Sequence, residues 1–122
     1  MLESILIAVG AFFGAISRVF VSKLSEDVVV RELPVATIAV NILGSFCLGI
    51  LIPVITISDL QYWFIVIGFL SSFTTFSSFV MEINNLWNVD KMKSVEYASY
   101  SLLFGFIVLS LGLVIGNQLL IT

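Results

Sequence analysis

The feature that most limits the fold of this chain is the length of its uncharged segments. Runs without Asp, Glu, Lys or Arg cover residues 4–17, 33–58, 60–81 and 97–122. A helix needs about 20 apolar residues to cross a bilayer. The runs therefore predict an all-α integral membrane protein with four transmembrane helices in a single membrane domain, residues 1–122. The expected spans cover about residues 4–22, 34–57, 60–82 and 95–119.

Composition agrees with this class and argues against several functions. Hydrophobic residues make up 60% of the chain and charged residues 11%, whereas soluble domains are about a quarter charged. The chain has no histidine and no cluster of carboxylates inside a span. An enzyme, a transition-metal site or a proton relay is therefore not expected. Because the chain starts with Met-Leu-Glu rather than a basic stretch, the first segment is interpreted as a retained span and not a signal peptide.

The basic residues are concentrated in two of the three expected connections. At or in the first and third connections lie Arg18, Lys23, Arg31, Lys91 and Lys93. With four spans these connections share one side of the membrane. Because cytoplasmic loops are enriched in Lys and Arg, the pattern places both chain termini outside.

Small residues recur at a spacing of four in three of the expected spans. Gly10 and Gly14 lie in the first span, Ser45 and Gly49 in the second, and Gly112 and Gly116 in the fourth, which also contains Gly105. Small residues at this spacing let helices approach closely in lipid. The pattern predicts tight helix packing and, because one small bundle can hardly enclose a pathway, an oligomer.

The stretch "GFLSSFTTFSSF", residues 68–79, is unusual for the middle of a span. Ser and Thr compete with the backbone for hydrogen bonds, so this stretch predicts a break in the third helix. Carbonyls freed at such a break are suited to a cation. Phe76 and Phe79 share a helix face, and the electropositive edges of their rings would favour an anion. The alternative is aromatic packing with the hydroxyls bonded to the preceding turn.

Other polar positions within the spans each allow two interpretations. Asn41 could take part in a pathway or bond to a neighbouring helix. Tyr97 and Ser101 lie on one helix face and form either a polar track or, for the tyrosine, an interfacial anchor. Arg18 could attract anions into a vestibule or extend its charge to the interface. Glu82 is expected to end the third span and meet water.

These motifs resemble the Fluc (CrcB) family of fluoride channels across all four spans. The resemblance is carried by "GAFFGAISR" at 10–18, "PVATIAVNILGSFCLG" at 34–49 and the "TTFS" core of residues 68–79. In the fourth span it is carried by the spacing of Tyr97, Ser101, Gly105 and Gly112. The resemblance implies a fluoride-selective passive channel that exports fluoride across the cytoplasmic membrane and gives fluoride resistance.

The same resemblance implies an assembly and a set of site residues. Two four-helix subunits would form an antiparallel, dual-topology dimer with a structural sodium ion at its centre. Backbone carbonyls of Ser71 and Thr74 would hold the sodium, and Arg18 would lie near the vestibule. The fluoride pathway would be lined by Asn41, Thr75, Phe76, Ser77, Phe79, Tyr97 and Ser101.

Departures from the family pattern keep other interpretations open. Ser71, Ser72 and Ala36 stand where the family commonly has glycine. The one-sided basic residues favour a chain that pairs with an oppositely inserted partner, as half of a heterodimeric channel. A non-transporting assembly subunit is a further alternative. A small multidrug exporter is disfavoured, because it needs an acidic side chain at mid-depth in a span.

Overall fold

The computed structural model describes residues 1–25 and 33–121. In that part, four helices are long and apolar enough to cross a membrane: Leu2–Ser25, Val35–Val54, Tyr62–Val89 and Lys91–Ile121. The predicted all-α fold with four transmembrane helices is confirmed. Arg31, one of the basic residues behind the topology prediction, lies outside the described residues.

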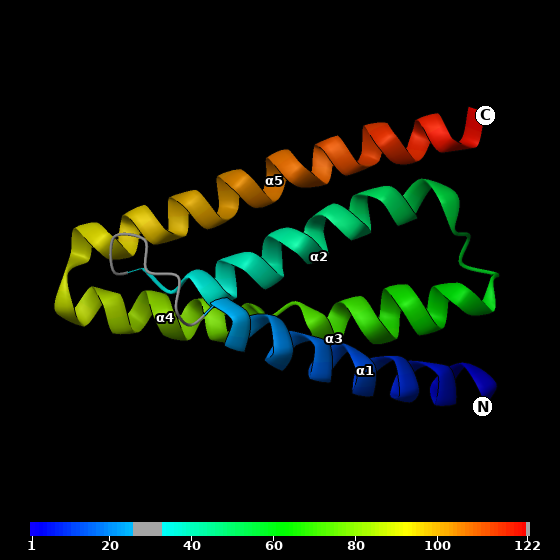
Figure 1. Ribbon diagram of the computed structural model, residues 1–122, viewed down its shortest axis with the longest axis horizontal. Coiled ribbons are helices and arrows are strands. Elements are labelled where there is room, and N and C mark those ends of the chain that lie inside the picture. The colour runs from blue at the N-terminus through cyan, green and yellow to red at the C-terminus, as the bar shows by residue number, and fades with distance from the viewer. Residues whose placement is uncertain (26–32, 122) are drawn as a thin grey trace.

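The helices run side by side in alternating directions, with both chain ends at one end of the bundle (Figure 1). Helix α1 covers Leu2–Ser25 and α2 covers Val35–Val54. The third span consists of η1 (Tyr62–Leu70), α3 (Ser71–Phe73) and α4 (Phe76–Val89). Helix α5, Lys91–Ile121, returns the chain to the end where it began.

Local sequence explains where these helices begin and end. Pro34 is the residue before α2, where a missing backbone N–H costs nothing. Asp90 lies between α4 and α5, and its Oδ1 accepts hydrogen bonds from the backbone of Met92 and Lys93. Because these bonds fix the start of α5 at Lys91, this helix begins before its uncharged run, which starts at residue 97. Helix α4 continues to Val89 rather than ending near residue 82.

Packing pairs helices that are not consecutive in the sequence. Helix α1 lies mainly against η1, and α2 lies mainly against α5. A Cβ atom added to Gly68 would come within 2.7 Å of the carbonyl oxygen of Ile7, and one on Gly112 within 2.5 Å of that of Phe46. Gly10, Gly14, Gly49 and Gly116 also meet backbone atoms of the facing helix. The predicted close packing of small residues is confirmed at Gly10, Gly14, Gly49, Gly112 and Gly116.

Gly105 is an exception to that packing. The nearest atom to an added Cβ there is the hydroxyl of Ser45, at 3.9 Å, which is an ordinary contact. Its place next to a cavity, described below, explains the space. Within the subunit, Gly105 therefore does not bring two helices together.

Candidate ion-conduction site

The third span is interrupted at two threonines. Helix α3 ends at Phe73 and α4 begins at Phe76, while Thr74 (φ −78°, ψ 159°) and Thr75 (φ −147°, ψ 115°) have extended backbones. Both the N–H and the hydroxyl of Thr74 donate to the carbonyl of Leu70, each at 3.0 Å. The hydroxyl of Thr75 accepts a hydrogen bond from the N–H of Ser78 at 3.2 Å. Thr75 is thus the N-cap of α4, a position for which threonine is favoured.

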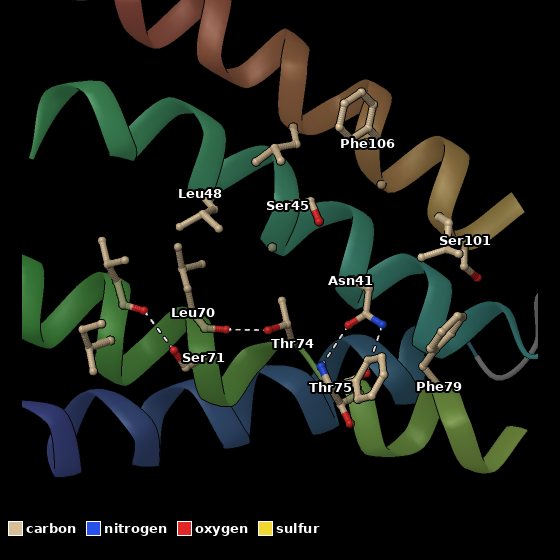
Figure 2. A pocket seen from close by; sticks show the side chains of 17 residues that line it. Asn41, Ser45, Leu48, Leu70, Ser71, Thr74, Thr75, Phe79, Ser101 and Phe106 are labelled. Atoms are coloured by element: carbon tan, nitrogen blue, oxygen red, sulfur yellow. Dashed lines mark hydrogen bonds between the residues drawn. The ribbon is translucent and has the colours of Figure 1, made fainter. Parts of the chain in front are cut away.

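Asn41 of α2 holds the backbone at this interruption from the side. Its Oδ1 accepts a hydrogen bond from the N–H of Thr75 at 2.9 Å, and its Nδ2 donates to the carbonyl of Thr75 at 3.1 Å. Figure 2 shows the amide of Asn41 facing this peptide segment. Because buried backbone groups need partners, the amide replaces the bonds that an unbroken helix would have supplied. Asn41 therefore does bond to a neighbouring helix, as one interpretation of the sequence expected.

The interruption diverts two N–H groups from their helical partners. In a continuous α-helix the N–H of residue i bonds the carbonyl of residue i−4. The N–H of Thr75 would then bond the carbonyl of Ser71, and the N–H of Ser78 would bond that of Thr74. Instead these N–H groups donate to Asn41 and to the hydroxyl of Thr75. The carbonyls of Ser71 and Thr74 are therefore released from those bonds.

A cavity of about 640 Å³ lies beside the interruption, between α2, the third span and α5. Most of its lining is apolar. Seven of the ten predicted site residues line it: Asn41, Ser71, Thr74, Thr75, Phe76, Phe79 and Ser101. Such a mostly apolar hollow with a few convergent polar groups is typical of a binding site.

The two predicted phenylalanines lie differently in this cavity. Phe79 is buried, with 8% of its surface exposed, whereas Phe76 is 76% exposed. Their ring centroids are 6.0 Å apart and the rings are tilted by 42°. Phe79 in turn lies 5.6 Å from the ring of Tyr97. The rings form a row that leads from the interruption toward α5.

Ser101 of α5 also lines this cavity. In residues 1–25 and 33–121, its Oγ is a buried side-chain oxygen without a hydrogen-bond partner. Figure 2 shows Ser101 on the far side of the cavity from Thr75, with Phe79 between them. Because a buried unpaired hydroxyl costs about 1–3 kcal/mol, a rotation of this side chain that lets a ligand in the cavity accept its hydrogen bond would be favoured.

Two of the neighbouring hydroxyls bond to the preceding turn. That of Thr74 does so through Leu70, and that of Ser71 donates to the carbonyl of Val66 at 3.3 Å. This is what the aromatic-packing alternative expected of them. Their backbone carbonyls, rather than these hydroxyls, are therefore the groups at the interruption that could hold a cation.

Three predicted site residues do not line the cavity. Ser77 is exposed, and its hydroxyl lies 3.3 Å from that of Thr75. Arg18 lies in the C-terminal third of α1. Tyr97 is completely buried, and its hydroxyl donates to the carboxylate of Glu82.

Glu82 has a role that the sequence analysis missed. Its carboxylate accepts hydrogen bonds from Tyr97 of α5 and from Thr37 of α2, the latter at 2.7 Å. The sequence analysis expected Glu82 only to end the span and meet water; the residue is partly exposed, but its carboxylate has these two hydroxyl partners, and α4 continues beyond it to Val89. A carboxylate next to an apolar run was the available signal, since such groups usually find a partner.

The described residues offer no side-chain cluster for a divalent metal. In residues 1–25 and 33–121, no group of three or more His, Cys, Asp or Glu side chains could hold a metal ion. Backbone carbonyls at an interrupted helix are instead suited to an alkali cation.

Four apolar helices, one of them interrupted beside a mostly apolar cavity that contains a few polar groups, define a multi-pass membrane protein with the features of an ion-conducting subunit. Comparison with known families gives a more specific result. The family described as CrcB-like protein, Camphor Resistance (CrcB), matches residues 5–113. The chain belongs to this family.

Curated relatives cover nearly the whole chain. The fluoride-specific ion channel FluC of Thermosipho melanesiensis is 36% identical over 121 residues, which cover 95% of this chain and 97% of that protein. FluC 2 of Bacillus cereus is 34% identical over 118 residues, covering 96% and 99% of the two chains. FluC 1 of Listeria monocytogenes is 32% identical over 117 residues, covering 95% and 98%.

Proposed function

We propose that this protein is the subunit of a fluoride-selective passive channel that exports fluoride across the cytoplasmic membrane and so gives fluoride resistance. The observation that carries the proposal is the unpartnered hydroxyl of Ser101 in a cavity that also contains Phe76, Phe79 and Asn41. The names of the relatives support the choice of ion. It is proposed to be a channel and not an enzyme.

The cavity offers fluoride replacements for its water shell. Ser101 can donate its hydroxyl proton, and Asn41 has a second N–H besides the one that bonds Thr75. Ring edges of Phe76 and Phe79 carry partial positive charge. Ser77 and Thr75 add hydroxyls near the interruption, and Arg18 would attract anions toward it. Tyr97 would take part when its hydroxyl leaves Glu82.

Transport would need no energy source. A membrane potential is worth about 2.3 kcal/mol per charge per 100 mV. When the cell interior is negative, that energy drives an anion out of the cell. A passive pathway is therefore enough to lower internal fluoride.

We also propose a structural sodium ion held by the backbone carbonyls of Ser71 and Thr74. The support is that both carbonyls have lost the N–H groups that a continuous helix would give them. The bound ion would neutralise their partial negative charge and hold together the interrupted helices of two subunits.

The proposed assembly is an antiparallel dimer of two copies or of this chain and a paired one. Support comes from Phe76, which projects from the subunit although it lines the cavity. A second subunit would cover it and close the pathway. The basic residues on one side favour a paired chain, and relatives with the numbered names FluC 1 and FluC 2 agree with duplicated genes.

Fluoride efflux from liposomes that contain the purified protein tests the channel. We expect rapid release of fluoride at a fluoride electrode while chloride is retained. Phe76→Ile removes a ring edge from the cavity and should reduce the efflux to that of protein-free liposomes. The matched control is Phe12→Ile on α1, where the exposed ring lies outside the cavity.

Each other result has a definite meaning. Equal efflux from Phe76→Ile and the wild type would refute the assigned pathway. No efflux from folded wild-type protein alone, restored by coexpression with an oppositely inserted paired chain, would show a heterodimer. If both preparations fail to release fluoride, the chain is a non-transporting assembly subunit.

A further inference from the structure

Two side chains of the proposed fluoride pathway are also the groups that release the proposed sodium ligands. The N–H that would bond the carbonyl of Ser71 donates to Asn41 at 2.9 Å. The N–H that would bond the carbonyl of Thr74 belongs to Ser78 and donates to the hydroxyl of Thr75 at 3.2 Å. Each of these two carbonyls thus corresponds to one side chain that has taken its partner.

We propose that Asn41 and Thr75 are positioning residues for the sodium ion. By holding these two N–H groups they keep the carbonyls of Ser71 and Thr74 free of their helical hydrogen bonds. This inference rests on the proposed function for the presence of sodium, but it concerns how this chain builds the site. It gives Asn41 a second role in addition to hydrogen bonding with fluoride.

The position of the interruption is set by the face of α2 that carries Asn41. Gly44, one turn further along α2, has no side chain, and an added Cβ would collide with the methyl group of Thr74. The amide of Asn41 bonds both the N–H and the carbonyl of Thr75. Together these contacts fix the two extended residues against α2, and with them the carbonyls on either side.

The hydroxyl of Thr75 is held in place by its own neighbours. It donates to the hydroxyl of Ser78 at 3.0 Å while it accepts the N–H of the same residue. Thr75 is also buried, so water does not compete for these bonds. If this hydroxyl is lost, the N–H of Ser78 is free to bond the carbonyl of Thr74 and complete a helical turn.

A consequence is that the same two side chains, Asn41 and Thr75, belong to the proposed fluoride pathway and also position the proposed sodium ligands. Residues that orient metal ligands without touching the metal typically change its affinity by about 10–100-fold when they are replaced. A substitution at Asn41 should therefore weaken sodium binding as well as alter the fluoride pathway, even though its side chain does not bind sodium.

The experiment measures sodium binding without measuring transport. The thermal unfolding midpoint of the purified protein is followed as sodium chloride replaces choline chloride at constant ionic strength. A ligand that binds only the folded protein raises this midpoint in a concentration-dependent way. We expect Asn41→Ala to raise the half-saturating sodium concentration by about tenfold or more. Asn88→Asp, on an exposed asparagine of α4, is the control and should leave it unchanged.

A second pair of variants still tests the inference if the Asn41→Ala protein does not fold. Thr75→Val keeps the branched shape but removes the hydroxyl, so it should also raise the half-saturating concentration. Thr75→Ser keeps the hydroxyl and should bind sodium as the wild type does. This difference would support the inference, because a purely steric role for Thr75 would be served as well by valine.

Two results would overturn the inference. Lower unfolding midpoints with an unchanged half-saturating sodium concentration would mean that Asn41 and Thr75 only stabilise the fold. If sodium does not raise the unfolding midpoint of the wild-type protein, the proposed sodium site itself is refuted. Neither result decides whether the protein is a fluoride channel, because fluoride efflux from the wild type tests that proposal separately.

Discussion

The two halves of α2 contact the rest of the protein in different ways. In its C-terminal half, Gly49 lies directly against the backbone of α5. In its N-terminal half, Thr37 and Asn41 reach the third span through side-chain hydrogen bonds. The glycine contact depends on the absence of a side chain, and the hydrogen bonds depend on particular polar side-chain atoms. Stability should therefore fall when side-chain volume is added at the contacts of the C-terminal half, and when a polar group is removed at the contacts of the N-terminal half.

The largest expected effect is in the glycine-packed half. Gly112→Ala places a Cβ within 2.5 Å of the carbonyl oxygen of Phe46. Because the obstacle is backbone on the facing helix, α2 and α5 must move apart. Overpacking of this kind costs up to about 3 kcal/mol, and we expect a clear fall in the thermal unfolding midpoint in detergent.

Gly105→Ala makes the same chemical change in the same helix and is the control. Its Cβ would meet only the hydroxyl of Ser45, at 3.9 Å. Alanine also favours a helix over glycine by about 1 kcal/mol, so the midpoint should stay constant or rise. Equal losses from both variants would contradict the distinction between packed and open glycines.

The next effect in size concerns Glu82 in the polar half. Glu82→Ala leaves the hydroxyls of Thr37 and Tyr97 without their acceptor. Burying such groups unpaired costs about 1–3 kcal/mol, so we expect a loss of about 2 kcal/mol in chemical unfolding. Glu82→Gln keeps one acceptor oxygen and should lose less. If alanine is tolerated as well as glutamine, the carboxylate does not hold these helices together.

The smallest effect is expected at Ser94, at the start of α5. Its hydroxyl is buried and donates to the carbonyl of Ile83 on α4 at 2.8 Å. Ser94→Ala should cost about 1 kcal/mol. Ser110→Ala removes a similar bond from an exposed serine, whose hydroxyl donates to Phe106 of its own helix, and should change stability by less than about 0.5 kcal/mol. The comparison fails if Ser110→Ala is the more damaging change.

Hydropathy was sufficient to predict the four helices, because the requirement for apolar length leaves few alternatives. The glycine contacts could also be predicted, since small residues at a spacing of four have one main use in a membrane. Gly105 is another small residue of the same helix but lines a cavity. Spacing alone does not reveal what lies opposite a residue.

The site residues were harder to separate by role. Ser101 and Phe79 both face the cavity, whereas the hydroxyl of Tyr97 is directed to Glu82. That bond joins α4 to α5, and the bond from Thr37 adds α2. A pattern along one helix predicts which residues share a face. It does not predict which of two acceptors on other helices will take a hydroxyl.

The pairing of α1 with η1 and of α2 with α5 also has a consequence for biosynthesis. As the spans leave the ribosome in order, α1 and α2 insert before either has its main partner. The glycine-lined face of α1 stays in contact with lipid until the third span is inserted. The glycine-lined face of α2 stays in contact with lipid until α5 is inserted. A chain stopped after two spans would expose both faces to quality-control proteases. Assembly of the subunit is therefore complete only after synthesis of the final helix.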